Sequence, residues 1–221
     1  GNVEKKYDAV AAGIGGDGGD GGNTYAYGVF GTGSSSHTAI AVDKISASAT
    51  AGAAGSGAAL GDGVATAGDD GVAGEEAKAY GVYAAGGAVI DLSAKNSGPI
   101  KINAKAADGT VTNEAYAVYA DKGTVLFGSD AELNWDGSSG TDNTLVTGLN
   151  NGTLGFSGTS ADRTVTGGKL QLTGSNAFRF TTDLANNKAD SMTFDTIENN
   201  SSKQYIQIGY EEAFKDALSK E

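Results

Sequence analysis

Residues 79–93 read AYGVYAAGGAVIDLS, and residues 115–129 read AYAVYADKGTVLFGS. The two segments are identical at 8 of 15 positions with an offset of 36 residues, which aligns Tyr80 with Tyr116. A third copy, AYGVF, occupies residues 26–30. Segments that resemble each other at a fixed offset are typical of a solenoid, because each coil stacks on a neighbour with like residues at like positions.

Apolar and polar residues alternate over short runs within each repeat, for example at 88–92, 100–104 and 124–127. Clusters of Gly, Asn, Asp and Ser separate these runs, which indicates short strands joined by tight turns and therefore an all-β protein. A β-sandwich is the alternative, but its strands need not resemble one another. The self-similarity favours a right-handed parallel β-helix of about eight to ten coils, each of roughly 20 residues.

The composition excludes several classes of function. The 221 residues include 36 Gly, one His and no Cys, so a disulfide framework, a Cys-ligated zinc site and a Cys nucleophile are all excluded. The net charge is −12 and only Arg163 and Arg179 carry a guanidinium, so neither nucleic acid nor an anionic membrane is an expected partner. The chain shows no signal peptide and no membrane-spanning run, and we interpret it as an excised mature segment.

The composition also divides the chain into three parts. Residues 1–130 carry the Gly- and Ala-rich repeats, with a low-complexity insert near 47–76 that would bury too little surface to order its own backbone. Residues 131–210 hold larger apolar side chains and are expected to form a stable cap on the solenoid. In residues 211–221, apolar side chains recur every four positions from Tyr210, which predicts a short amphipathic helix.

The C-terminal part has a distinctive order of strands and turns. Residues 170–194 read LQLTGSNAFRFTTDLANNKADSMTF, and residues 143–156 read NTLVTGLNNGTLGF. This order resembles the C-terminal part of pertactin-like autotransporter passengers of Gram-negative bacteria. The positions that carry the resemblance, and that we expect to build the cap, are Trp135, Leu154, Phe156, Leu170, Leu172, Phe178, Phe180, Asp183, Asp190 and Phe194.

The resemblance implies an exported, monomeric passenger, structural or adhesin-like, at the cell surface or secreted from a Gram-negative bacterium. In that family the C-terminal coils act as an autochaperone that templates folding of the β-helix, and an outer-membrane β-barrel translocates the passenger. A host glycan or protein receptor is the implied partner, and no catalytic residue, metal or cofactor is expected. A β-helical carbohydrate-active enzyme, either lyase or glycosidase, and a β-sandwich adhesin are the alternatives.

Three polar motifs invite a chemical interpretation. Residues 15–23 read GGDGGDGGN and superficially match a Ca²⁺-binding nonapeptide, but a single copy predicts a flexible acidic loop. His37 follows three serines without the nucleophile elbow or oxyanion loop of a serine hydrolase, so it predicts a surface residue. A glycosidase needs two opposed carboxylates. The candidate pairs are Asp91 with Glu114, and Asp130 with Glu132.

The tyrosines of the repeat are the candidate binding surface, because aligned aromatic rings could form a ladder that binds glycan rings. The ladder residues are Tyr80, Tyr83, Tyr116 and Tyr119. Strict alternation predicts that Tyr80 and Tyr116 stack on one side of the sheet and that Tyr83 and Tyr119 stack on the other. Packing in the interior or at an edge of the solenoid is the alternative for these rings.

Overall fold

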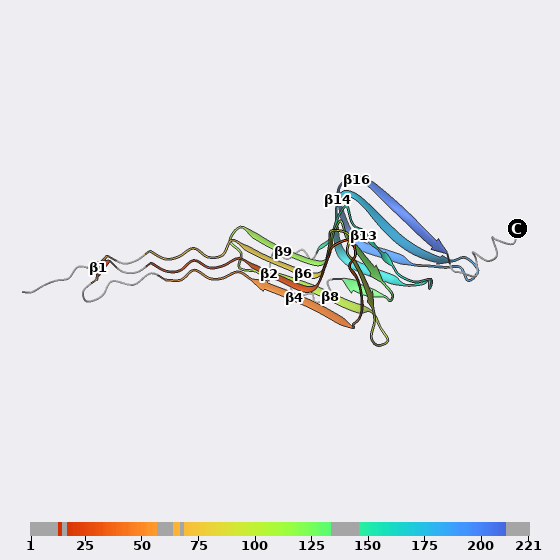
Figure 1. Cartoon of the computed structure of the whole chain (residues 1–221), viewed down its shortest axis with the longest axis horizontal. Coiled ribbons are helices and arrows are strands. Elements are labelled where there is room, and N and C mark those ends of the chain that lie inside the picture. The colour runs from red at the N-terminus through yellow and green to blue at the C-terminus, as the bar shows by residue number, and fades with distance from the viewer. Residues whose placement is uncertain (1–12, 15–16, 57–63, 67–68, 134–145, 211–221) are drawn as a thin grey trace, which may run out of the picture.

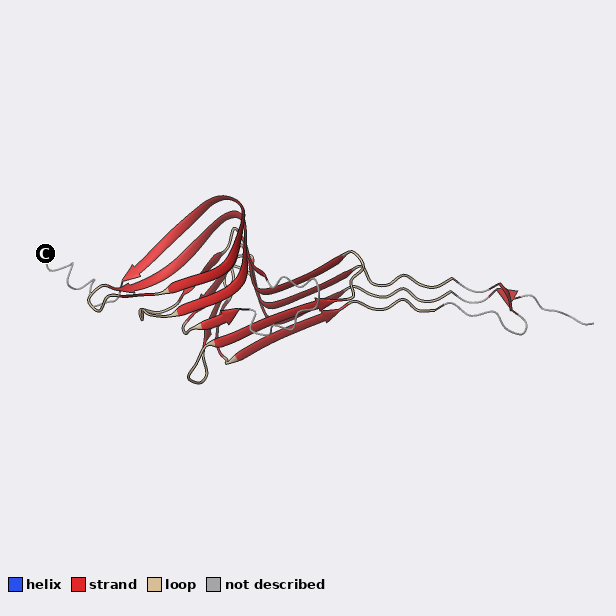
Figure 2. Cartoon of the chain, turned by 180° about the vertical axis from the view of Figure 1, so that it is seen from behind, coloured by secondary structure: helices blue, strands red, loops and turns tan. Residues whose placement is uncertain are grey.

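The computed structural model describes residues 13–14, 17–56, 64–66, 69–133 and 146–210. All regular structure in these ranges is β-strand, arranged as a 14-stranded sheet and a separate two-stranded sheet (Figures 1 and 2). Within the same ranges no helix is long and apolar enough to cross a membrane. Trp135 and the helix predicted over 211–221 both lie outside the described residues.

The chain forms coils of three strands, and like strands of successive coils pair in parallel. The first face stacks β2 (Thr24–Thr32), β6 (Glu76–Ala85), β9 (Thr112–Asp121) and β12 (Val146–Asn150). The second face stacks β3 (His37–Ala41), β7 (Val89–Ser93), β10 (Thr124–Phe127) and β13 (Thr153–Phe156). The third face stacks β4 (Lys44–Thr50), β8 (Ile100–Ala107) and β11 (Ala131–Leu133).

Two strands of 20 residues continue the solenoid. The strand β14 (Thr164–Asp183) pairs in parallel with β11, β12 and β13 in turn, so it follows all three faces. The strand β16 (Ser191–Tyr210) pairs with β14 in parallel along its length. The remaining strands are short: β15 (Lys188–Ala189) is antiparallel to β14, and β1 (Gly13–Ile14) pairs with β5 (Val64–Thr66).

The strand register confirms the predicted parallel β-helix. Tyr80 pairs with Tyr116 at the predicted offset of 36 residues, and Tyr27 in the third copy pairs with Tyr80. Parallel pairing excludes the β-sandwich, whose sheets are antiparallel. Six strand segments stack on the described first face, fewer than the predicted eight to ten coils. The observed coils are longer than the roughly 20 residues predicted, because the insert and the loops between strands take up additional residues.

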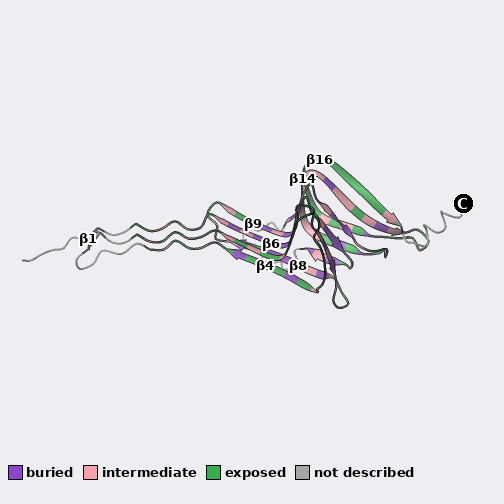
Figure 3. Cartoon of the chain, viewed as in Figure 1, coloured by how far each residue is buried: buried purple, intermediate pink, exposed green. Residues whose placement is uncertain are grey.

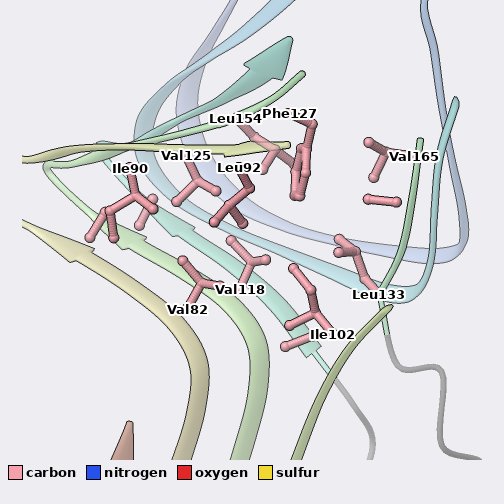
Figure 4. Packing of buried hydrophobic residues seen from close by; sticks show 14 of the residues in the cluster. Val82, Ile90, Leu92, Ile102, Val118, Val125, Phe127, Leu133, Leu154 and Val165 are labelled. Carbon is pink, nitrogen blue, oxygen red and sulfur yellow. The ribbon is translucent and has the colours of Figure 1, made fainter. Parts of the chain in front are cut away.

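The interior side chains are smallest on the side of the solenoid that carries the alanines of β4, β6, β8 and β9, and larger elsewhere. One buried cluster contains only alanines, contributed by β4, β6, β8 and β9 and by Ala51 beside them. The main cluster contains Val, Leu, Ile and Phe side chains (Figures 3 and 4). Its largest fully buried members are Phe127 and Phe156. Opposite strands can approach closely where only methyl groups separate them, so the alanine cluster marks the thin part of the solenoid.

The C-terminal coils bury large apolar side chains, but their outer end is uncovered. Leu149, Leu154, Phe156, Val165 and Leu170 are buried in the coils that precede β16. The inward-facing residues of β16 itself remain accessible, because no described strand stacks on its other edge. The most exposed of them are Ile197 at 63%, Ile206 at 70% and Ile208 at 54%.

A second kind of packing extends from the thin side of the solenoid. Residues 17–23, 51–56 and 69–75, which we call the glycine bundle, lie side by side and extend from β2, β4 and β6 (Figure 1). Two of these segments belong to the predicted low-complexity insert. Their backbones are joined by hydrogen bonds of 2.7–2.9 Å, and the donors and acceptors form a closed ring: 17–23 donates to 69–75, 69–75 donates to 51–56, and 51–56 donates to 17–23.

Glycine recurs every third residue on the inner side of this bundle. A Cβ added to Gly18 would lie 2.0 Å from the carbonyl oxygen of Gly55, and one added to Gly71 would lie 2.2 Å from that of Gly19. Collagen follows the same rule, because only glycine fits where three chains meet at one axis. The bundle differs in direction, since its middle segment in sequence, 51–56, runs antiparallel to the other two.

Replacing an inner glycine should open the bundle, whereas replacing an outer one should not. The Cβ of Gly21→Ala would lie 2.1 Å from the Gly52 carbonyl oxygen, so we expect a destabilisation of about 1–3 kcal/mol. The matched control is Gly22→Ala, because nothing lies within 4 Å of the added methyl group. Hydrogen exchange at the Gly71 and Gly74 amides would measure the opening, and equal exchange in the two variants would contradict this packing.

Candidate functional site

The aromatic side chains of the first face form two adjacent ladders. Tyr27, Tyr80 and Tyr116 stack with ring centroids 5.2 and 5.4 Å apart and planes within 9° of parallel. The second ladder consists of Phe30, Tyr83 and Tyr119, with centroid distances of 5.5 Å at both steps. The ladders touch each other through tilted contacts, the closest being 4.7 Å between Tyr116 and Tyr119.

Both ladders lie on the outside of the solenoid, so the prediction that Tyr80 and Tyr83 face opposite sides is wrong. Gly81 and Val82 are both buried, as are Ala117 and Val118 in the next coil, so the alternation is interrupted between the tyrosines. The register shows the same interruption, because no pair is formed at Gly81. A Cβ on Gly81 would lie 2.6 Å from Ile102 Cγ2, which shows how closely the strand approaches the core at this bend.

The two ends of the ladders differ in exposure. At one end Gly148 follows Tyr119 in the register, and a Cβ there would lie 2.5 Å from the Tyr119 ring, so the rings cover a position that has no side chain. At the other end no described strand stacks on the free edge of β2. Tyr27 and Phe30 are therefore 45% and 53% exposed and present the free ring faces of the ladders.

Charged residues border the ladders on the same face. The Lys78 ammonium lies 3.4 Å from Glu76 and 3.9 Å from Glu114, and the Tyr25 hydroxyl donates a hydrogen bond to the Glu76 carboxylate. Burial, assisted by the negative charge of Glu114, raises the pKa of Tyr116 to about 12. Burial also raises the pKa of Tyr80, so the Tyr80 and Tyr116 phenols stay neutral at physiological pH.

A buried ion pair links three successive coils at the centre of the C-terminal part. The Arg163 guanidinium donates to both carboxylate oxygens of Asp190, with Nε–Oδ1 and Nη2–Oδ2 distances of 3.0 and 2.9 Å. It also donates to the Phe127 carbonyl oxygen at 3.3 Å and lies 5.0 Å from the centroid of the Phe156 ring. Asp190 in turn accepts the backbone N–H groups of Arg163 and Thr181. We call this group the Arg163–Asp190 clamp.

The predicted cap positions divide by burial. The fully buried positions are Leu154, Phe156, Leu170 and Leu172. Phe178, Phe180 and Phe194 are half-buried against the same cluster, since β16 covers them only in part. Asp183 accepts two hydrogen bonds from Asn186, as expected for a turn, and these hold the pKa of its carboxyl below the ordinary value.

The glycine–aspartate repeat has a structural role, and His37 is an exposed surface residue. The repeat GGDGGDGGN supplies one segment of the glycine bundle, where the Asp17 and Asp20 carboxylates accept the N–H groups of Asp69 and Val72 at 3.0 and 2.8 Å. His37 is exposed at the start of β3. Among the described residues, no three His, Cys, Asp or Glu side chains are grouped so that they could hold a metal ion.

The candidate carboxylate pairs do not converge as the glycosidase alternative requires. Asp91 lies on the second face in β7, whereas Glu114 lies on the first face in β9. Asp130 accepts the backbone N–H of Thr164 at 2.7 Å, and Glu132 lies 3.8 Å from the Lys101 ammonium. The contacts of Asp130 and Glu132 join neighbouring coils, which is a structural role for both carboxylates.

Sequence reasoning found the tyrosines but missed their full extent and the clamp. The third repeat copy could have added Tyr27 and Phe30 to the ladders, because they occupy the same positions as Tyr80 and Tyr83. The clamp has no comparable signal, since Arg163 and Asp190 are 27 residues apart and meet only through the coil geometry. No family model matches the chain, and searches of curated proteins and of solved structures also give no match.

Alkaline pH should destabilise the fold through the ladders. The ordinary tyrosine pKa is 10.0 and the folded value at Tyr116 is about 12, so the unfolded chain loses its phenol protons first. The free energy of unfolding should therefore fall as the pH rises from about 10 to about 12. Thermal unfolding followed across this range would measure the loss. Tyr116→Phe should reduce the slope, and an unchanged slope would contradict the role of this phenol.

Breaking the clamp should cost more than neutralising the carboxylate of Asp183, which serves a turn and pairs with no buried cation. Asp190→Asn leaves the buried Arg163 charge uncompensated, and we expect a destabilisation of about 3–5 kcal/mol in urea unfolding. Asp183→Asn is the matched control, because it keeps a similar turn and faces no buried cation. Similar losses in the two variants would show that the clamp contributes no more than the turn.

Proposed function

We propose that this protein is an exported, surface-displayed passenger segment of structural or adhesin-like type, whose C-terminal coils template the folding of the β-helix. The parallel β-helix supports the proposal, because a stack of coils can grow by adding one coil to an existing edge. The resemblance of residues 131–210 to passenger C-termini supports it independently. The decisive question is whether the two ends of the stack differ enough in stability for folding to have a direction.

The observation that carries the proposal is the unequal core. The C-terminal coils contain Leu, Val and Phe side chains and the Arg163–Asp190 clamp, and β14 and β16 pair over nearly their whole length at a separation of about 27 residues. The first coil instead joins the second across the insert, and alanine and glycine supply much of its packing there. A shorter loop and a larger buried area both favour early folding of the C-terminal coils.

The same direction determines which edge becomes the template. Once β12 and β13 have formed, their free edges present backbone groups and Leu149, Leu154 and Phe156 to the preceding coil. The coil of β9 and β10 then adds Val118 and Phe127 to the same cluster. Over its described residues, the first coil buries alanines and only one large side chain, Ile45, and therefore depends more on the edge already formed.

The adhesin-like part of the proposal is supported by the exposed end of the ladders. Within each ladder the ring faces contact neighbouring rings, so a sugar ring cannot stack on them. Tyr27 and Phe30 alone present open faces, and the nearby Glu76 and Tyr25 offer hydrogen-bonding groups. Aromatic faces beside polar groups are suited to carbohydrate, which has both apolar C–H faces and hydroxyls.

Folding order tests the proposal. In refolding followed by pulsed hydrogen exchange, amides of residues 146–194 should be protected before those of residues 24–50. Phe156→Ala should cost about 3–5 kcal/mol and delay protection of both parts, because Phe156 is fully buried in the template. Phe30→Ala is the control, since its 53% exposed side chain lies at the far end of the stack and should leave the C-terminal coils unaffected.

Two results would contradict this order. Protection of residues 24–50 before the C-terminal coils would reverse the direction of templating. Simultaneous protection of all coils, in the wild type and in both variants, would indicate a single cooperative unit with no template.

A further inference from the structure

The ladders bring together oxidisable side chains from different coils. The protein has no Cys and therefore cannot form a disulfide between coils. It has nine Tyr, and five of them (Tyr27, Tyr80, Tyr83, Tyr116 and Tyr119) lie in one network of ring contacts with centroids 4.7–5.8 Å apart. A phenol that loses one electron and one proton becomes a phenoxyl radical, and two neighbouring radicals join through a carbon ortho to the oxygen.

We propose that Tyr83 and Tyr119 form a dityrosine cross-link between the second and third coils when the folded protein meets hydrogen peroxide and a haem peroxidase. Their rings are stacked with centroids 5.5 Å apart and planes within 5° of parallel, and the parallel register holds the two side chains side by side. The rings lie on the outer face and are only half-buried, so an oxidant can reach them.

The composition of the two ladders singles out this pair. In the second ladder Tyr83 lies between Phe30 and Tyr119, and a phenylalanine ring cannot form a phenoxyl radical, so Tyr119 is its only stacked partner for coupling. In the first ladder Tyr80 is stacked between Tyr27 and Tyr116, so a Tyr80 radical has two stacked tyrosines with which it can couple. The Tyr116 hydroxyl also contacts Gln171 at 3.5 Å, which ties that ring to a later coil.

The reaction balances without any further component. Each tyrosine gives up one electron and one hydrogen ion in total, a new C–C bond joins the two rings, and both rings regain their hydroxyl groups. The two electrons and two protons reduce one hydrogen peroxide to two water molecules. One ortho C–H bond breaks on each ring, so the product lacks two hydrogen atoms, and no other bond of the chain is broken. This chemistry does not depend on the proposed function, since it requires only the folded chain and the oxidant.

The bond would fasten two neighbouring coils beside their shared core. Tyr83 and Tyr119 are 36 residues apart, and Val82 and Val118 next to them belong to the main buried cluster. Closing a loop of this length constrains the unfolded chain, so the cross-linked protein should melt about 8–15 °C higher than the untreated protein.

The test treats the folded protein with a haem peroxidase and limiting hydrogen peroxide. We expect dityrosine fluorescence, loss of two hydrogen atoms from the monomer mass, and unchanged migration as a monomer. Cleavage after lysine should then yield peptide 79–95 joined to peptide 106–122, with fragment ions placing the bond at Tyr83 and Tyr119. Tyr83→Phe and Tyr119→Phe should each abolish this linked pair while retaining a stacked ring.

The matched control is Tyr205→Phe. Tyr205 is 52% exposed and makes no ring contact in the described part of the chain, so its removal should leave the linked pair unchanged. A bond mapped to Tyr80 and Tyr116, a yield unaffected by Tyr83→Phe, or products consisting of dimers linked through Tyr205 would each overturn the proposal. An absence of dityrosine in the treated wild-type protein would overturn it as well.

Discussion

The volume of the inward-facing side chains sets the distance between opposite strands, and the rest of the structure depends on it. Where Val, Leu, Ile and Phe point inward, three strands enclose a core. Where only alanine points inward, the first and third faces converge. Where glycine recurs every third residue, the backbones meet and hydrogen-bond to one another directly. A single chain thus passes from a solenoid to a collagen-like bundle because its interior residues become smaller in one direction.

This constraint explains which parts of the fold could be predicted from the sequence. The aligned tyrosines and the alternating runs determine coils, because each coil must bury one side of every strand against its neighbours. The glycine bundle could not be found in this way. Its side chains bury little surface, and backbone hydrogen bonds hold it together instead. These bonds join segments far apart in sequence, the most distant pairs, such as Gly21 and Val72, being 51 residues apart. The relevant signal is the spacing of three between glycines in GGDGGDGGN, a pattern that also resembles a calcium-binding motif.

In the candidate site, too, the features that follow the sequence repeat could be predicted and the others could not. The ladder positions follow from the repeat, but their side of the sheet does not, because the bend at Gly81 replaces strict alternation with two consecutive buried residues. Asp190 is one of the predicted cap positions, and in the structure its carboxylate compensates a buried guanidinium. A buried ion pair of this kind need not add net stability, because the desolvation of both charges offsets their attraction. Here it fixes the relative position of three coils whose other contacts are non-directional.

The mixed strand directions of the glycine bundle have a mechanical consequence. A load applied along the bundle would act on its ring of backbone hydrogen bonds in shear, so that several bonds must fail together. A load applied along the stacking axis of the solenoid would instead open one coil at a time, beginning at the uncovered edge of β16 or β2. The molecule is therefore expected to be stiff in one direction and to yield stepwise in the perpendicular one.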